Sequence, residues 1–315
     1  MFAVKRLHLA LSLAAGLSAI HETSGAAELY KYHDANGSLV YTDRKPDSPA
    51  VKVESLSVGL ESKAPRIVIQ AFSADTKWQL VATNECLCVV EFGGRITESH
   101  NLDVTDGAEF HQILPPRSQQ IVLEIAHSPQ SGAPVARVAW KGILGAPGAQ
   151  HNPPVPYRAP FAVGASYKVT QAYPARVTHT SATDQYAVDF ALPDGTPVNA
   201  AREGTVINVK HDKYRGAATP LMMDQANMVE ILHDDGTIAI YAHLHWDSVR
   251  VQPGQYVRRG EYIADSGSTG FSTGAHLHFA VIRNAGMSAE SVPVQFAGPG
   301  GTAITAQTNA VLTAY

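Results

Sequence analysis

Short runs of alternating apolar and polar residues, separated by turn-forming residues, limit the fold of this chain more than any other feature. Five such runs lie between residues 51 and 144: RIVIQAFSA, WQLVATN, LCVVEFGG, QQIVLEIAHS and ARVAWKGIL. A period of two is typical of strands that bury one face, and no long amphipathic helical pattern accompanies it. The sequence therefore predicts a mainly β protein, with an immunoglobulin-like β-sandwich as an accessory domain over residues 51–144.

The composition argues against some classes of protein. Hydrophobic residues make up 45% of the 315 residues and charged residues 17%, which is typical of a folded chain rather than a disordered one. The formal net charge is −4, and no run of Lys and Arg forms a basic patch. These features argue against nucleic-acid binding.

The N-terminal segment has the pattern of a secretory signal peptide. Lys5 and Arg6 precede an apolar run over residues 9–20, and the small residues SGAA follow at positions 24–27. The apolar run is shorter than the ~20 residues that a membrane-spanning helix needs. We therefore expect a cleaved signal peptide over residues 1–27, no membrane span, and export to the periplasm or cell envelope.

Turn and breaker residues divide the rest of the chain. Asn36-Gly37 stands between two aromatic-rich runs and predicts a small hairpin module over residues 28–50. A stretch rich in Pro, Gly and Ala predicts a linker at residues 145–160. A second β domain is expected over residues 161–297, followed by a flexible tail over residues 298–315.

The chain has two cysteines, Cys86 and Cys88. An exported chain can form a disulfide, but two residues at positions i and i+2 of an extended strand lie near the outer limit of the bridging distance. A disulfide and a soft-metal site both stay open, and we favour two structural thiols in a strand.

Seven of the fourteen histidines lie between positions 179 and 278, and two of them stand in the segment AHLHF. If this segment is a strand, His276 and His278 share one face, whereas Ala275, Leu277 and Phe279 point to the other. The pattern predicts a strand with its back in a core and two imidazoles presented to a cleft.

A second pair of histidines stands in the segment IAIYAHLHW. The turn HDDGT precedes it and makes it the second strand of a hairpin whose first strand is NMVEILH. Alternation predicts that Tyr241, His243 and His245 share one face. We interpret His245 and His233 as surface or supporting histidines.

Asp189 lies in the apolar segment DQYAVDFAL, with Ala187 and Ala191 on its face. A carboxylate buried among alanines is unfavourable unless it is paired, hydrogen-bonded or bound to a metal. One Asp and several His from separate strands are the donors of a catalytic zinc site with three protein ligands. The helical motif HExxH is absent, so any zinc here would be held by strands.

The segments GTPVNAAREGTVINV, NMVEILHDDGT, YAHL and GSTGFSTGAHLHF resemble, in this order, the pattern of the lysostaphin/LytM-type zinc metallopeptidases. The resemblance covers roughly residues 161–283. It implies an antiparallel β-sheet groove, a Zn²⁺ cofactor, and a metalloendopeptidase that cuts peptide cross-links in peptidoglycan.

The resemblance also implies roles for individual residues. Asp189 and His278 would be zinc ligands, and His243 and His276 would be the catalytic histidines on either side of an activated water. One of these histidines would accept the proton of the water, and the other would stabilise the oxyanion. The sequence does not assign the two roles between them.

The third metal ligand does not follow from the commonest family pattern. The commonest family pattern, H-x-x-x-D, would place a histidine where this chain has Gln185. The nearest upstream histidine is His179, in a polar, turn-prone segment, so we expect His179 to complete the site. His211 and His245 are the competing donors.

A catalytically inactive relative that binds and activates another cell-wall hydrolase is the alternative function. Inactive relatives usually lose several ligand positions, whereas this chain keeps Asp189, His243, His276 and His278. We therefore favour an active enzyme with peptidoglycan as its substrate. The role of the β-sandwich stays open, and contact with an envelope protein partner is one option.

Overall fold

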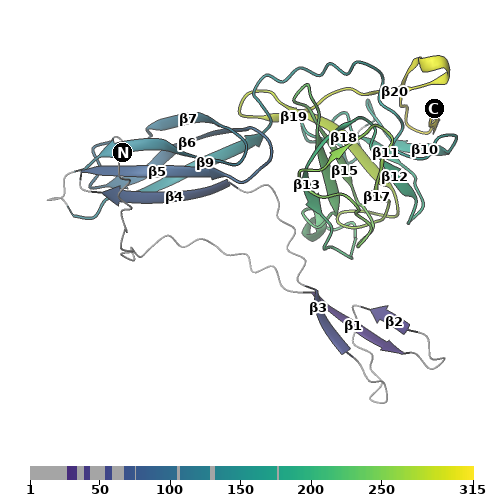
Figure 1. Ribbon diagram of the computed structural model, residues 1–315, viewed down its shortest axis with the longest axis horizontal. Helices are drawn as coiled ribbons and strands as arrows, with labels where there is room; N and C mark the ends of the chain where they lie inside the picture. The colour runs from purple at the N-terminus through teal and green to yellow at the C-terminus, as the bar shows by residue number, and fades with distance from the viewer. Residues whose placement is uncertain are drawn as a thin grey trace, which may run out of the picture. The chain divides into compact units, whose positions relative to one another are not determined.

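The computed structural model describes residues 27–33, 39–42, 54–58, 67–74, 76–104, 107–127, 132–175 and 177–315 (Figure 1). Strands dominate this part of the chain, every strand pair in it is antiparallel, and its only helical turns are short 3-10 segments at Pro220–Met222 and Pro299–Gly301. The prediction of a mainly β fold is confirmed. No helix among the described residues has the length and apolar character needed to cross a membrane. Residues 1–26 of the predicted signal peptide lie outside the described residues.

The N-terminal unit, residues 1–60, contains one small sheet. Its strands are β1 (Ala27–His33), β2 (Leu39–Thr42) and β3 (Glu54–Val58), in the order β2-β1-β3. The antiparallel pairing of β1 with β2 agrees with the predicted hairpin. The predicted turn at Asn36-Gly37 lies outside the described residues.

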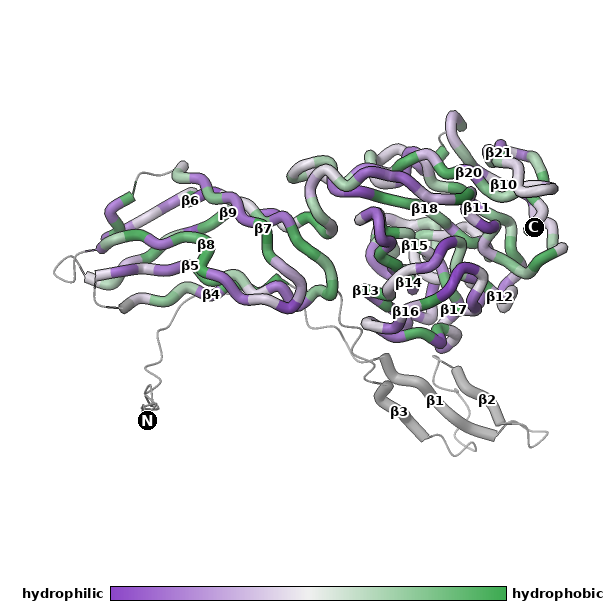
Figure 2. Tube along the Cα trace, turned by 45° about the horizontal axis from the view of Figure 1, so that its top comes forward, coloured by the Kyte–Doolittle hydropathy of each residue, from purple (hydrophilic) through white to green (hydrophobic). Residues whose placement is uncertain are grey.

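The first half of the second unit, residues 61–315, contains two three-stranded sheets. One has the order β4-β5-β8 and the other the order β7-β6-β9. Hydrophobic and hydrophilic residues alternate along these strands (Figure 2), and the apolar residues of both sheets pack into one buried cluster. The strands are β4 (Ile67–Ala74), β5 (Lys77–Asn84), β6 (Val90–His100), β7 (Glu109–Leu114), β8 (Ser118–Ala126) and β9 (Val135–Leu144).

Strand β7 is absent from the sequence-based prediction. Its sequence, EFHQIL, buries only Phe110 and Leu114. Two buried residues four positions apart do not produce a clear period of two, so the strand is recognised only from its pairing with β6.

Cys86 and Cys88 form a disulfide with Cα atoms 5.2 Å apart, so the favoured prediction of two thiols in a strand is wrong. The chain bends between β5 and β6 instead of running extended, which brings the two Cα atoms within bridging distance. The buried Asn84 holds this bend. Its Oδ1 accepts a 2.9 Å hydrogen bond from Cys86 N, and its Nδ2 donates one of 2.9 Å to Cys88 O.

The remaining strands form a large sheet with the order β16-β13-β14-β15-β18-β11-β10-β22, and β19 pairs with β18 beside it. Its strands are β10 (Ser166–Gln171), β11 (Val188–Phe190), β13 (Gly204–Lys210), β14 (Met228–Leu232), β15 (Ile238–Ala242), β16 (Tyr256–Val257), β18 (Leu277–Asn284), β19 (Ala289–Ser291) and β22 (Val311–Thr313). Two smaller pairs accompany the sheet: β12 (Pro197–Asn199) with β17 (Tyr262–Asp265), and β20 (Gln295–Ala297) with β21 (Ala303–Thr305). The predicted hairpin of β14 and β15 is confirmed.

One face of the large sheet packs into the hydrophobic core. Val229, Tyr241, Leu277 and Phe279 are fully buried there, together with Phe190 of β11. Because side chains alternate along a strand, the intervening residues of β11 and β18 point to the opposite face. That face carries the candidate site.

The C-terminal residues differ from the predicted flexible tail. Strand β22 pairs with β10, and Leu312 and Ala314 are buried in the core. Small residues hide this strand in the sequence because they dilute its apolar pattern. The segment at 145–160 has no strand, but Tyr157 and Ala159 are also buried in the core, so its C-terminal part is packed rather than free.

The buried His233 predicts a pH-dependent stability. Burial lowers the pKa of His233 to about 4, while its Nδ1 donates a 2.7 Å hydrogen bond to Glu203 O. An unfolded chain protonates the same imidazole at its ordinary pKa of 6.5. The unfolded state therefore binds more protons between these two pKa values, and stability is lost as the pH falls through this range.

We expect His233→Gln to flatten this dependence, since the amide can still donate to Glu203 O but does not titrate. Between pH 7 and pH 5 the wild type should lose about 2 kcal/mol more free energy of unfolding than the variant. Urea denaturation at both pH values measures the difference. Equal losses in the two proteins would contradict a neutral buried His233.

Candidate functional site

A row of neighbouring residues crosses four strands on the face of the large sheet opposite Tyr241 and Phe279. Gln171 on β10 pairs with Asp189 on β11, Asp189 pairs with His278 on β18, and His278 pairs with Ala242 on β15. Directly opposite residues of antiparallel strands project to the same side. The sheet register therefore brings Asp189 and His278 together although 89 residues separate them.

His179 joins this pair from the loop between β10 and β11. Its Nε2 lies 3.1 Å from Asp189 Oδ2, and His278 Nδ1 lies 3.0 Å from Asp189 Oδ1. One donor atom from each of the three residues lies within 4.8 Å of the other two. The three residues that the sequence predicts as metal ligands thus lie together.

The charges in this group are those that a metal site needs. Burial alone would raise the pKa of Asp189, but hydrogen bonds from His179 and His278 hold it well below its usual range. Burial disfavours protonation of His278, but the carboxylate of Asp189 outweighs this effect and raises the pKa of His278. An ionised, buried carboxylate between two imidazoles attracts positive charge, whether a proton or a metal ion.

The donor set fits zinc. Zinc prefers imidazole nitrogen and carboxylate oxygen, and catalytic sites use three protein ligands. A further carboxylate lies close by, since Asp184 Oδ1 is 3.7 Å from His278 Nε2. Gln185, where the commonest family pattern has a histidine, carries a neutral amide, which is not among the side chains that zinc prefers. The group His179, Asp189 and His278 could therefore hold a divalent metal ion.

Strand alternation does not predict the position of the His243 side chain. Strand β15 ends at Ala242, and His243 has a φ of 62°. Tyr241 is fully buried in the core, where its hydroxyl accepts a 2.7 Å hydrogen bond from Ala201 N. The expectation that Tyr241 and His243 share a face of one strand is wrong, because the left-handed backbone at His243 redirects its side chain.

The rings of His243 and His276 lie next to each other, with centroids 4.5 Å apart, and the ring of His243 lies 5.9 Å from that of His278. Both predicted catalytic histidines therefore lie at the metal-binding group. Ala275 is exposed rather than buried, because β18 begins at Leu277.

Backbone carbonyls fix the orientation of both rings. His243 Nδ1 donates a 2.7 Å hydrogen bond to Thr269 O, and His276 Nδ1 donates one of 2.9 Å to Gly274 O. In the neutral imidazole this leaves Nε2 as the unprotonated nitrogen. Carbonyl groups of the glycine-rich stretch at residues 267–274 thus hold the two histidine rings in place. Gly270 illustrates its tight packing: its φ is 79°, and a Cβ there would lie 2.6 Å from Ala226 N.

Two buried residues, Asn227 and Thr269, support the carbonyl that orients His243. Asn227 Oδ1 accepts a hydrogen bond of 2.9 Å from Lys213 N, and its Nδ2 donates one of 2.6 Å to Lys213 O. Asn227 N donates a 3.0 Å bond to Thr269 Oγ1, which in turn donates a 2.8 Å bond to Leu244 O. These bonds hold Thr269 against the end of β15. The sequence carries no signal for Asn227, because its part in the site depends on hydrogen bonds that its backbone and side chain make only in the fold.

The environment keeps His243 uncharged. Burial lowers its pKa to about 4, and the neighbouring His276 and His278 push it in the same direction. A neutral imidazole with an oriented Nε2 can accept a proton near pH 7.

The remaining histidines of this region have other partners. His245 Nδ1 lies 3.0 Å from Asp194 Oδ1, and His233 donates to Glu203 O. Neither belongs to the metal-binding group, and neither does His211.

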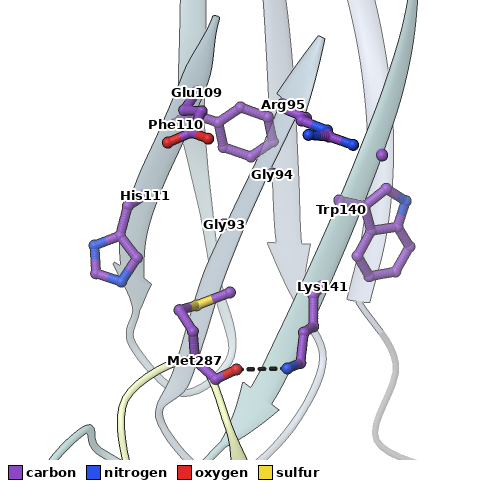
Figure 3. Close-up of a pocket in the computed structure, with 10 residues that line it drawn as sticks. Gly93, Gly94, Arg95, Glu109, Phe110, His111, Trp140, Lys141 and Met287 are labelled. Carbon is purple, nitrogen blue, oxygen red and sulfur yellow. Dashed lines mark hydrogen bonds between the residues drawn. The ribbon is translucent and has the colours of Figure 1, made fainter. Parts of the chain in front are cut away.

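A cavity of about 560 Å³ lies elsewhere, on the sheet of β6, β7 and β9. Figure 3 shows Gly93 and Gly94 on β6, with His111 on one side and Lys141 on the other. Lys141 Nζ donates a 2.5 Å hydrogen bond to Met287 O at its edge. None of the five predicted site residues lines this cavity, so the histidine chemistry does not take place there.

The part of the sequence that contains the site matches a known protein family. Residues 183–290 match the model of Peptidase family M23. The match contains Asp189, His243, His276 and His278, and it begins four residues after His179. The resemblance to lysostaphin/LytM-type peptidases is confirmed.

Individual relatives agree with this match. Lysostaphin of Staphylococcus staphylolyticus is 35% identical over 94 residues, which are 30% of this chain and 18% of lysostaphin. Peptidoglycan DD-endopeptidase ShyB of Vibrio cholerae is 39% identical over 94 residues, 30% of this chain and 19% of ShyB. The chain therefore matches less than a fifth of the length of these relatives. The crystal structure of a zinc-containing peptidase from Vibrio cholerae aligns with 75% of this chain and 86% of its own, at 17% identity and a TM-score of 0.34.

The geometry predicts one metal ion per protein, with His179 as the expected third ligand. His179→Ala should weaken zinc binding by more than the ~100-fold that the loss of an outer supporting residue causes, because a direct donor is removed. Gln185→Ala is the matched control and should bind zinc like the wild type. Titration of the metal-free proteins against a chromogenic chelator measures both affinities. Stoichiometric, wild-type zinc binding by His179→Ala would exclude His179 as a ligand.

Proposed function

We propose that this chain, which carries a domain of Peptidase family M23 at residues 183–290, is a zinc-dependent endopeptidase that hydrolyses peptide cross-links of cell-wall peptidoglycan. One observation carries the proposal: a His–Asp–His donor set lies beside two oriented histidines on one face of a sheet. The names of the relatives, lysostaphin and a peptidoglycan DD-endopeptidase, support the choice of substrate.

His179, Asp189 and His278 are the proposed ligands of the zinc ion. When bound, zinc would lower the pKa of a coordinated water and polarise the carbonyl of the scissile bond. The three side chains are buried or nearly so, which limits competition from solvent for the ion. The carboxylate of Asp189 supplies one negative charge to balance it.

His243 and His276 are the proposed proton-transfer residues. The hydrogen bonds to Thr269 O and Gly274 O leave each Nε2 free for the substrate side. One neutral imidazole accepts the proton of the attacking water. The other, protonated from solvent, donates a hydrogen bond to the oxyanion and later its proton to the leaving amine, and the first histidine then returns the proton of the water to solvent.

The proposal includes the setting of the enzyme. We propose that a signal peptide over residues 1–27 directs it to the periplasm or cell envelope and is then removed. Residues 28–50 and 51–144 are proposed as accessory modules, 145–160 as their connection to the peptidase domain, and 161–297 as that domain. The accessory region at 51–144 is the candidate for contact with an envelope protein partner.

Hydrolysis should depend on the metal. We expect purified protein to release soluble muropeptides from isolated peptidoglycan, and a chelator to abolish the release, since the water loses its activation. Zinc added back should restore it. Digestion followed by chromatography of the products makes the measurement. Folded, zinc-loaded protein that releases nothing would instead favour an inactive relative that activates another hydrolase.

The two histidines should matter for turnover rather than for metal binding. His243→Ala and His276→Ala should each lower the rate by ~10²–10⁴-fold, the usual contribution of a general acid or base. Each variant should keep one zinc ion, because the proposed ligands remain. His245→Ala is the control and should retain activity, since its partner is Asp194. Loss of zinc from either variant, measured by elemental analysis, would make that histidine a ligand instead.

A further inference from the structure

Gln171 is a buried amide beside the metal-binding group that no part of the proposed mechanism uses. It is the last residue of β10, it is 5% exposed, and it is the register partner of Asp189. The chain leaves the sheet directly after it and returns at β11, and His179 lies on the excursion between these strands.

Both ends of the Gln171 amide are occupied. Its Oε1 accepts hydrogen bonds of 2.9 Å from Val177 N and 3.0 Å from Thr178 N, the two residues that precede His179. Its Nε2 donates a 2.9 Å bond to Thr178 Oγ1 and a longer one, 3.4 Å, to Asp189 Oδ2. This oxygen is the one that lies 3.1 Å from His179 Nε2.

We propose that Gln171 is a positioning residue of the metal centre, which holds His179 and Asp189 in register with each other. The inference rests on the proposed function only in taking His179, Asp189 and His278 as the metal ligands. The role of Gln171 explains how a metal ligand can stand ten residues before Asp189 rather than four residues before it. A loop of this length has many conformations, and an amide that binds the backbone just before His179 selects one of them.

The contacts distinguish this role from simple anchoring of the loop. Thr308 anchors the start of the same loop, since its Oγ1 accepts a 3.0 Å hydrogen bond from Ala172 N and donates one of 3.0 Å to Ala172 O. These bonds hold the start of the loop at Ala172 and do not involve the residues next to His179. Thr308 is therefore a matched control: its loss also removes side-chain bonds to the backbone of the loop.

The test compares Gln171→Leu and Thr308→Val with the wild type. Each metal-free protein is titrated with zinc in competition with a chromogenic chelator, and circular dichroism verifies the fold. We expect Gln171→Leu to raise the zinc Kd by ~10–100-fold, as loss of an outer partner of a ligand does, and Thr308→Val to leave it unchanged. A wild-type Kd for Gln171→Leu, or an equal rise in both variants, would overturn the proposal.

A second variant covers the case in which Gln171→Leu does not fold. Gln171→Asn keeps the amide but is one methylene shorter, so it cannot reach residues 177–178 and Asp189 together. Its zinc Kd should also rise, and a wild-type value would refute the positioning role. Zinc binding is measured without substrate, so the outcomes are separable. Wild-type protein that binds zinc but does not cut peptidoglycan would refute the proposed function alone, whereas normal zinc binding by the Gln171 variants would refute this inference alone.

Discussion

The buried carboxylate of Asp189 is the interaction on which the rest of the site depends. A buried charge without a partner is strongly destabilising, and here His179 and His278 each lie about 3 Å from one of its oxygens. Asp189 stands on a strand of three residues between β10 and β18. Pairing on both sides fixes its backbone, so its charge has a constant position. Any group that balances this charge, whether a proton or a metal ion, must therefore come to the same place.

The site has two halves with different supports. Asp189 and His278 are held by the register of the sheet, which changes only if strands slip and expose the core face. His243 and His276 stand at strand ends and are oriented by the carbonyls of Thr269 and Gly274. The first half needs a rigid frame, because ligand geometry decides metal affinity. The second half depends on loop backbone, which is held in turn by buried groups such as the backbone N–H of Asn227, a donor to Thr269 Oγ1.

The sequence predicts the parts of this protein that follow from local periodicity. Strands β14, β15 and β18 are short, mainly apolar runs, and the site residues on or next to them could be named in advance. The alternation misleads at His243, because the backbone turns left-handed directly after Ala242. It also misleads at Cys86 and Cys88, where Asn84 bends the chain. Neither event has a periodic signal, since each depends on contacts made by a single residue.

The position of His179 shows what a motif at fixed spacing does and does not require. Asp189 and His278 are neighbours through strand pairing, and this part of the geometry is independent of any loop. A third donor needs only to reach the free side of the carboxylate, and its distance along the chain is not constrained by the sheet. A histidine four residues before Asp189 would lie close to it with little chain to hold. A histidine ten residues before it reaches the same place only if the intervening chain is fixed. The longer spacing is therefore compatible with the site as long as the fold supplies side chains that hold the loop, and the buried amide of Gln171 lies where such a support is needed.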